Sequence, residues 1–348
     1  MKATKKDIRQ ITKLELQKFF LDHHAPKFRA QQVYEWLWKQ HQLDFNKMTN
    51  IPLSQRTLLK DHFITQSIKI IKATTSQDGT IKFLFQLENN NVVEGVLIPQ
   101  LNRLTACISS QSGCSLACDF CATGKLKFSR NLHAFEIYDQ AFLINKYCIS
   151  NFKKPITNIV FMGMGEPLLN FKNVLQSIDY ITSVIGMGMS GKRITVSTVG
   201  ITKIIRKIAD MNPNFNLAIS LHSANDNKRS QIMDINSTNN LSKLLDALQY
   251  FYAKTGIKPT YEYVLLNSFN DSYQDAKELI NFCNKIPSKV NLIEYNKVDG
   301  APYQKSTQRS TNSFISVLEK NNILVKLRRS RGEDIGAACG QLATQNKQ

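Results

Sequence analysis

The spacing of apolar residues changes along the 348-residue chain. In the first part apolar side chains recur every three or four positions, which predicts three helices, at residues 11–23, 28–40 and 53–63. The next part is rich in β-branched and aromatic residues between polar turns, which predicts a short antiparallel sheet from residues 67–76, 80–87 and 91–99. We therefore expect a helical accessory module over residues 1–66 and a β-rich extension over residues 67–103.

From residue 104 onward, strand-like apolar segments alternate with amphipathic helices. Strands are expected at residues 104–109, 156–162, 192–198, 215–221, 259–266, 289–295 and 323–329, and helices at residues 134–149, 170–185, 201–211, 240–255 and 272–284. This alternation is typical of βαβ units with a parallel sheet. The pattern predicts an α/β core over residues 104–345, in which six units form an open, partial (β/α)6 barrel.

Charge and cysteine content narrow the class of protein. With 45 Lys and Arg against 27 Asp and Glu, the net charge of +18 favours a polyanionic partner such as nucleic acid. A surface of solvated lysines is the alternative, and salt dependence of binding separates the two. No apolar run is long enough for a membrane span, and the charged start does not look like a secretory signal. The seven cysteines, an odd number, fit a reducing cytoplasm.

Three of these cysteines, Cys114, Cys118 and Cys121, stand in C-x3-C-x2-C spacing. Three thiolates can hold three irons of a [4Fe–4S] cluster and leave the fourth iron open to a ligand. This spacing is the signature of radical S-adenosylmethionine (SAM) enzymes. Structural zinc is the alternative, but it needs a fourth ligand, and His133 is an awkward candidate twelve residues beyond the loop.

Polar motifs follow several of the predicted strands at their carboxyl ends. A parallel α/β barrel assembles its active site at that edge, so these side chains are expected to meet. An acid beside glycines can approach and pair with an ammonium group, and hydroxyl, imidazole and amide groups can bind other parts of a ligand. The candidates for binding SAM are Gly165, Glu166, Ser197, Ser220, Leu221, His222 and Asn296.

Two further cysteines stand out by position. Cys107 lies on the strand that enters the cysteine loop, and Cys339 lies in a polar, glycine-flanked segment after the last strand. A lone cysteine is more often a small buried hydrophobic residue than a catalyst. Cys148 and Cys283, within helical stretches, are expected to be core residues of that kind.

Taken together, these motifs resemble the RlmN/Cfr family of radical SAM RNA methyltransferases, and its RlmN members most. The resemblance covers about residues 15–345 and is carried by VEGVLIP, CISSQSGCSLACDFCATG, FSRNL, FMGMGEPLLN, ITVSTVG, AISLHS, the YN and GAPY around residues 295–303, and RGEDIGAACGQL. It implies one [4Fe–4S] cluster, two SAM molecules per turnover, and methylation of C2 of adenosine in 23S rRNA and beside the anticodon of tRNA.

The resemblance also implies roles for individual residues. One SAM methylates the Cys339 thiolate, a radical from the second SAM activates that methyl group, and the methylene adds to the adenine ring. Glu94 matches the proton acceptor, and Cys107 attacks Cys339 to release the product and form a disulfide. An electron donor such as flavodoxin or ferredoxin is implied, and a monomer is our default.

Three alternatives remain open at this point. Cfr-like members methylate C8 of the same ribosomal base. A zinc- or cluster-stabilised RNA-binding protein without catalysis would share the charge and the cysteine loop, although it leaves Cys107 and Cys339 without a role. A radical SAM enzyme acting on a protein or a small molecule is disfavoured by the charge of +18.

Overall fold

The computed structural model describes residues 5–87 and 91–343; the ends of the expected ranges at residues 1–4 and 344–345 lie outside these residues. The expected N-terminal helices are present: α1 Lys13–Asp22, α2 Arg29–Tyr34 continued by the π-helical turn η2 Glu35–Lys39, and α3 Leu53–His62, with short 3-10 turns η1 Ile8–Gln10 and η3 Phe45–Lys47. Helix α1 begins where it does because Thr12 and Glu15 form a reciprocal capping box. β1 Lys6–Asp7 and β2 Phe63–Ile64 pair and bring the two ends of the module together.

The remaining described chain is organised by one ten-stranded sheet, in the order β14-β13-β12-β11-β10-β9-β6-β5-β4-β3. Its strands are β3 Lys69–Thr75, β4 Ile81–Gln86, β5 Val92–Gln100, β6 Arg103–Cys107, β9 Asn158–Phe161, β10 Ile194–Thr198, β11 Asn216–Ser220, β12 Thr260–Leu265, β13 Lys289–Glu294 and β14 Val325–Arg328. From β6 to β14 every neighbouring pair is parallel, which confirms the predicted α/β core. Since β3 and β14 are the edges, the sheet is open, as expected for a partial barrel.

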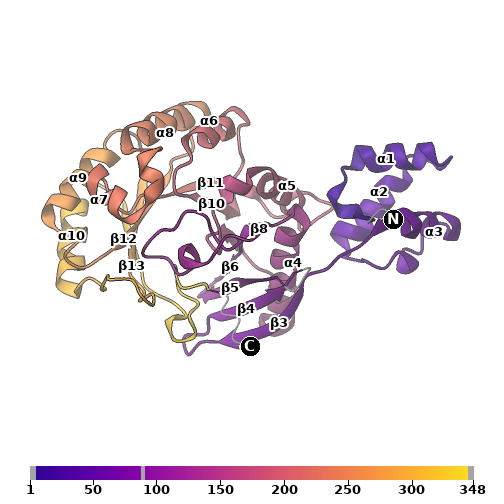
Figure 1. The fold of residues 1–348 in the computed structure, drawn as a ribbon, viewed down its shortest axis with the longest axis horizontal. Helices are drawn as coiled ribbons and strands as arrows, with labels where there is room; N and C mark the ends of the chain where they lie inside the picture. The colour runs from indigo at the N-terminus through magenta and orange to yellow at the C-terminus, as the bar shows by residue number, and fades with distance from the viewer. Residues whose placement is uncertain (1–4, 88–90, 344–348) are drawn as a thin grey trace.

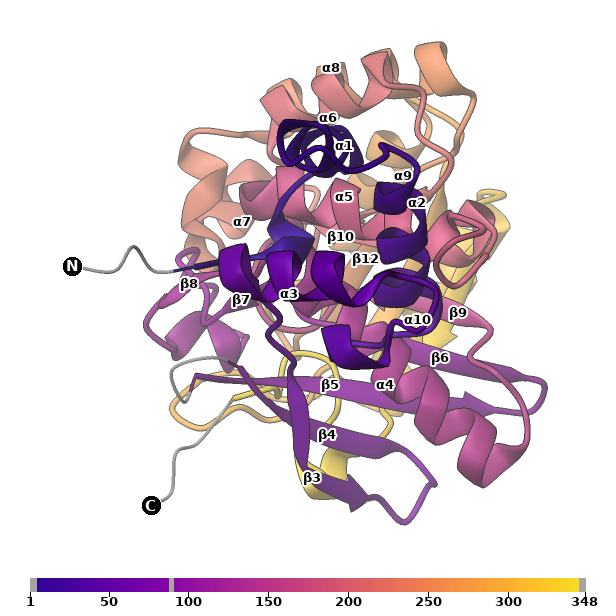
Figure 2. The same ribbon diagram turned by 90° about the vertical axis from the view of Figure 1, so that its right-hand side faces the viewer.

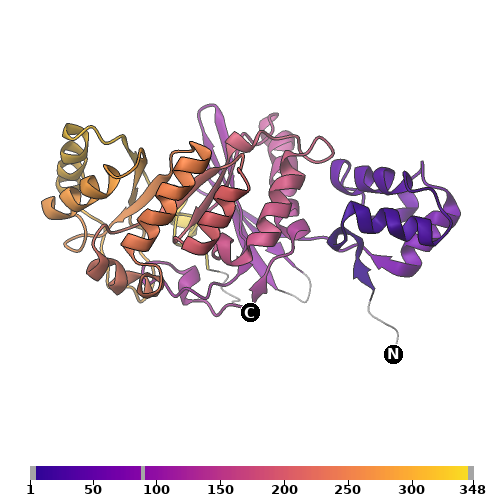
Figure 3. The same ribbon diagram turned by 90° about the horizontal axis from the view of Figure 1, so that it is seen from above.

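Helices connect the parallel strands and form an outer arc around the sheet (Figures 1 and 3). They are α4 Ala134–Phe152, α5 Phe171–Thr182, α6 Thr202–Asp210, α7 Asp226–Ile232, α8 Leu241–Thr255, α9 Tyr273–Cys283 and α10 Gln308–Lys320. All five helices that the sequence predicted in the core are among them. Cys148 on α4 and Cys283 on α9 are buried in the hydrophobic core, as expected.

The β-rich extension is joined to the core more closely than the sequence suggested. Strands β3, β4 and β5 pair antiparallel, and β5 pairs with β6, so the extension continues the core sheet instead of forming one of its own. This arrangement places Glu94 on β5 in the strand next to Cys107 on β6. Both side chains are buried.

The N-terminal module stands at one end of the long axis of the molecule, in front of the core in the view of Figure 2. Its contact with the core includes a buried ion pair, since Arg9 Nη1 lies 2.9 Å from Asp139 Oδ1 on α4 and both side chains are fully buried. His41 Nε2 lies 2.9 Å from the same oxygen. The Arg9 guanidinium also lies over the Phe135 ring, 4.3 Å from its centre. Desolvated charges persist only when paired in this way, so the contact is specific.

Candidate active site

The three-cysteine loop follows β6 and is closed at its base by a short hairpin, in which β7 Gln111–Ser112 pairs with β8 Arg130–Asn131. Cys118 is buried, and Cys114 and Cys121 are partly exposed. Burial raises the pKa of all three thiols, to about 11 for Cys114, and each of the three lies near another of the set. The thiols are therefore neutral until positive charge is brought to them.

No three His, Cys, Asp or Glu side chains converge on one point within residues 5–87 and 91–343, as a single bound metal ion would require. His133, the possible fourth zinc ligand, instead begins helix α4 and stacks on Phe135. A [4Fe–4S] cluster makes a different demand, because each cysteine ligates a separate iron and the sulfurs need not converge. Three neighbouring thiols without a fourth ligand fit such a cluster.

Glu166 lies at the end of β9 with its carboxylate already aligned. Oε1 accepts from the Leu168 amide and Oε2 from the Val199 amide, both at 2.9 Å. Burial raises its pKa to about 7, although these hydrogen bonds oppose the rise. A buried carboxylate of this kind is stabilised by an incoming cation, such as the ammonium of an amino acid.

Gly165 sets the backbone conformation immediately before Glu166. Its φ of +90° is open to glycine, and an added Cβ would lie 2.4 Å from Cβ of Gln111. Gln111 in turn accepts a 2.8 Å hydrogen bond from the Glu166 amide through Oε1. The glycine is therefore required so that the cysteine loop and the β9 end can lie in contact.

The remaining strand-end candidates also meet. The hydroxyl oxygens of Ser197 on β10 and Ser220 on β11 are 3.5 Å apart. Asn296, after β13, is buried and donates to the Cys339 carbonyl at 3.1 Å. Its side-chain oxygen accepts from the Ser330 hydroxyl. Ser197, Ser220 and Asn296 thus lie at the carboxyl ends of parallel strands of one sheet.

His222 is held neutral in the loop after β11. Its Nδ1 accepts from the Val264 amide at 3.1 Å, and burial together with Arg229 lowers its pKa to about 3. Asn270 fixes the backbone by donating to the carbonyls of His222 and Val264.

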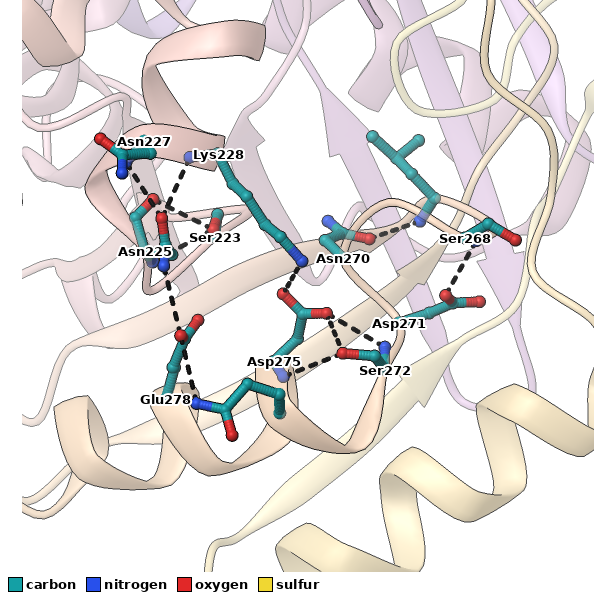
Figure 4. A network of polar contacts seen from close by, with 12 residues as sticks. Ser223, Asn225, Asn227, Lys228, Ser268, Asn270, Asp271, Ser272, Asp275 and Glu278 are labelled. Atoms are coloured by element: carbon teal, nitrogen blue, oxygen red, sulfur yellow. Dashed lines mark hydrogen bonds and ion pairs between the residues drawn. The ribbon is translucent and has the colours of Figure 1, made fainter.

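Farther out, a polar network ties α7 to the start of α9 (Figure 4). In it Lys228 Nζ lies 2.7 Å from Asp275 Oδ1. The loop after β11, which begins at Leu221, is thereby tied to α9, since Asn225 also donates to Glu278.

Arg229 on α7 was not recognised from the sequence. It is fully buried and donates to the carbonyls of Val199 and Leu221 and to the side chain of Asn236, so it connects the loops after β10 and β11. A single arginine in a polar helix carries no signal of burial in the sequence.

Cys107 and Cys339 lie within electrostatic range of each other, although 232 positions separate them in the chain. Each thiol interacts electrostatically with Arg328, and the charge of Arg328 opposes the rise that burial causes in the pKa of both, to about 12 for Cys107. Cys107 lies close enough to Cys339 to feel its charge, and Cys339 lies close enough to feel that of Cys121. Cys339 is also reached by solvent.

Arg328 at the end of β14 was missed, as was its partner Glu262 on β12, 3.0 Å away. The sequence did contain a sign that these two residues are functional, because a charged residue on a predicted core strand is unusual and both are of this kind. All seven cysteines, which lie within the described residues, are free thiols, so the expected disulfide is not a resting bond of the structure.

Glu94 lies beside the same segment. Its Oε2 accepts from the Ala343 amide at 2.9 Å, and Oε1 lies 3.4 Å from Lys82 Nζ. Burial raises the pKa of this carboxyl, while Lys82 and the amide lower it. A carboxylate with a raised pKa is suited to accept a proton near neutral pH.

Comparison with known proteins places this arrangement in a family. A model of the radical SAM superfamily matches residues 108–283, and a model described as the ribosomal RNA large subunit methyltransferase N-terminal domain matches residues 6–65. A probable dual-specificity RNA methyltransferase RlmN of Christiangramia forsetii is 50% identical over 346 residues, covering 99% of this chain and 98% of the relative. The chain belongs to the RlmN family.

Other members agree with this assignment. The dual-specificity RNA methyltransferase RlmN of Geotalea uraniireducens is 41% identical over 97% of this chain and 96% of its own length. A crystal structure of a radical SAM methyltransferase from Sphaerobacter thermophilus superposes with a TM-score of 0.90 at 34% identity, covering 97% of this chain and 99% of that one. As an RlmN-family radical SAM protein, the chain uses a [4Fe–4S] cluster and SAM. No helix of the described residues is long and apolar enough to cross a membrane.

Proposed function

We propose that the protein is a radical SAM RNA methyltransferase that methylates C2 of adenosine in 23S rRNA and in tRNA, with Cys339 carrying the methyl group. The observation that carries this proposal is that the Cys339 segment lies against the cysteine loop, where the Ala122 amide donates to the Gly340 carbonyl at 2.7 Å, with Cys107 and Cys339 both in electrostatic range of Arg328. A SAM enzyme that acted on its substrate directly would have no use for two such thiols. The RlmN relatives, named as dual-specificity RNA methyltransferases, support the choice of substrate.

The binding roles follow from the geometry. Cys114, Cys118 and Cys121 would hold the cluster. Glu166, reached past Gly165, would pair with the amino group of SAM, while Ser197, Ser220, Leu221, His222 and Asn296 would line the rest of its site. When bound, the cluster and SAM supply the radical that removes a hydrogen atom from a methyl group.

Cys339 is the methyl carrier because its thiol is accessible and faces Arg328, whose charge favours the nucleophilic thiolate. Once the methylene carbon is bonded to the adenine, the ring carries an unpaired electron; the adduct would return one electron to the oxidised cluster, and Glu94 would accept the proton from that ring carbon. The Cys107 thiolate then attacks the Cys339 sulfur, so that an S–S bond forms as the S–CH2 bond breaks. The electron pair left on carbon collects a proton to give the methyl group, and two electrons from a donor restore the thiols.

Partners and organisation are proposed on the same basis. The net charge of +18 favours RNA as the partner. The chain would consist of an RNA-docking module over residues 1–66, the β-rich extension over residues 67–103 and the catalytic core over residues 104–345. A flavodoxin or ferredoxin would deliver electrons to a monomeric protein. A reducing cytoplasm is the compartment in which free thiols and an exposed cluster persist.

The test is a trapped reaction. Cys107→Ala removes the thiol that releases the product, so the reconstituted variant, given SAM, a reductant and transcribed 23S rRNA fragments or tRNA, should remain covalently attached to RNA on a denaturing gel. Cys283→Ala, which removes a buried thiol from α9, is the matched control and should turn over. Mass spectrometry of digested RNA distinguishes C2 from C8. Normal turnover by Cys107→Ala without an adduct would exclude the two-cysteine route.

A further inference from the structure

The segment that carries Cys339 has little regular structure to hold it. Between β14 and the end of the described chain it contains only the 3-10 turn η9 Glu333–Ile335. It lies against the turn that joins β3 and β4, residues 76–80, and both segments are visible near β4 in Figure 1. Without a strand ladder, side-chain contacts must fix its position.

The contacts between this turn and the Cys339 segment are reciprocal. Asp334 accepts from the Ser76 hydroxyl at 2.5 Å and from the Gln77 amide at 3.1 Å. In the opposite direction, Asp78 accepts from the Gly332 amide at 3.0 Å, and its carbonyl accepts from Arg331. The hydrogen bonds also lower the pKa of Asp78 and Asp334, so both accept as carboxylates at neutral pH.

The backbone on the two sides of Cys339 is held as well. On the amino-terminal side, Lys82 Nζ lies 3.4 Å from the Gly336 carbonyl. On the carboxyl-terminal side, the Gly340 carbonyl accepts from the Ala122 amide at 2.7 Å, next to the cluster cysteine Cys121. The segment is thus held between the extension and the cysteine loop, and the hydrogen bonds that Asp78 and Asp334 accept across the interface anchor its start.

We propose that Asp334 and Asp78 are positioning residues, a clamp by which the β3–β4 turn holds Cys339 in register with Cys107 and the cluster loop. The inference rests on the proposed function, because it concerns the thiol that carries the methyl group. Neither carboxylate touches the reacting atoms. They act by limiting where the Cys339 sulfur can be, and misplacement of a reacting group by about 1 Å can cost roughly 100-fold in rate.

Asp334→Ala is the informative variant. The Asp334 side chain accepts hydrogen bonds from Ser76 and Gln77, which both lie across the interface, whereas Asp78 also accepts from the Thr80 amide and supports its own turn. Glu333→Ala is the matched control, since Glu333 is the neighbouring exposed acid and has no side-chain partner in the described structure. Asp334→Asn keeps a hydrogen-bond acceptor and should rescue most of the loss.

Two measurements on the reconstituted protein test the clamp. Hydrogen–deuterium exchange over residues 331–343 should increase at least about threefold in Asp334→Ala and stay unchanged in Glu333→Ala. RNA methylation should lose roughly 10- to 100-fold in kcat, with the KM values for RNA and SAM unchanged. The exchange measurement needs no RNA, so it stands even if the proposed substrate is wrong.

Each other outcome overturns the clamp. Unchanged exchange would show that Asp334 does not hold the segment, whatever happens to the rate. Faster exchange with an unchanged kcat would show that the contact does not position Cys339. Equal losses in kcat and in affinity for RNA, or failure of Asp334→Asn to recover activity, would assign Asp334 to RNA docking or to its charge alone.

Discussion

Replacing Lys82 by methionine should move the acid limb of the methylation rate to higher pH. The proposed base Glu94 must be ionised to accept a proton, and Lys82 is the cation that faces it, with Nζ 3.4 Å from Oε1. Methionine keeps most of the apolar stem of the lysine while removing its charge. Burial raises the pKa of Glu94 and Lys82 lowers it, so the pKa should rise further when the cation is removed.

The size of the change follows from Coulomb's law. Two unit charges 3.4 Å apart interact by about 1.2 kcal/mol in water and by about 5 kcal/mol at an effective dielectric constant of 20. The Lys82 side chain is 22% exposed and that of Glu94 is 7% exposed, so the pair lies between these limits. At 1.36 kcal/mol per pH unit, the pKa of Glu94 should rise by roughly one to three.

The assay is the pH dependence of single-turnover methylation by protein whose Cys339 already carries the methyl group. Below the new pKa the variant should lose about tenfold per pH unit, and at alkaline pH its rate should reach a plateau; any difference between that plateau and the wild-type rate reports the lost contact of Lys82 with the Gly336 carbonyl, not the ionisation of Glu94. Lys72→Met, which removes an exposed lysine from the neighbouring strand β3, is the control and should keep the wild-type profile. An unmoved acid limb in Lys82→Met would refute Glu94 as the base, or Lys82 as the group that sets its pKa.

The other predictions concern three different parts of the molecule. Gly165→Ala forces a Cβ to within 2.4 Å of Gln111 at a φ of +90°, at a cost of about 1–3 kcal/mol, so SAM binding measured by equilibrium dialysis should weaken roughly tenfold. Asp139→Asn removes the carboxylate that Arg9 Nη1 pairs with and leaves Asp7, 3.7 Å from Arg9 Nε, as the buried counter-ion, so the free energy of unfolding should fall by about 1–3 kcal/mol, measured by denaturant titration. Arg328→Met should slow SAM-dependent methylation of Cys339 at pH 7.5, followed by intact mass, and the loss should shrink as the pH is raised, because removing the cation raises the pKa of the thiol further.

The core could be predicted because its periodicity is strong. A parallel strand buried on both faces is a continuous apolar run, and an amphipathic helix separates most of these strands from the next, so β9 to β14 were expected within a few residues. The pairing of β5 with β6 could not be predicted. A strand that extends the core sheet and a strand of a separate sheet have the same alternation of apolar and polar residues. Which strands pair depends on contacts between segments that are distant in the chain, and the pattern within each segment does not reveal these contacts.

In the active site, residues at strand ends were predictable and residues that act across the sheet were not. Glu166, Ser197 and Asn296 each follow an apolar run directly, so their common location followed from the parallel topology. Arg229 lies on α7, and its burial depends on carbonyls contributed by two other loops. The Asp334 contact joins residues 258 positions apart, and no local pattern marks either end.

The two groups of cysteines differ in the positive charge that stabilises their thiolates. Burial raises the pKa of Cys114, Cys118 and Cys121, so these thiols ionise only when iron compensates their charge, and cluster assembly must release protons. Burial also raises the pKa of Cys107 and Cys339, but the permanent cation of Arg328, itself fixed by Glu262, opposes the rise in both. Arg328 therefore lowers the cost of forming either thiolate without a metal, and one cation shared by both thiols favours only one thiolate at a time. The order required by the proposed chemistry, Cys339 first and Cys107 after it, is consistent with a single charge serving two sulfurs in turn.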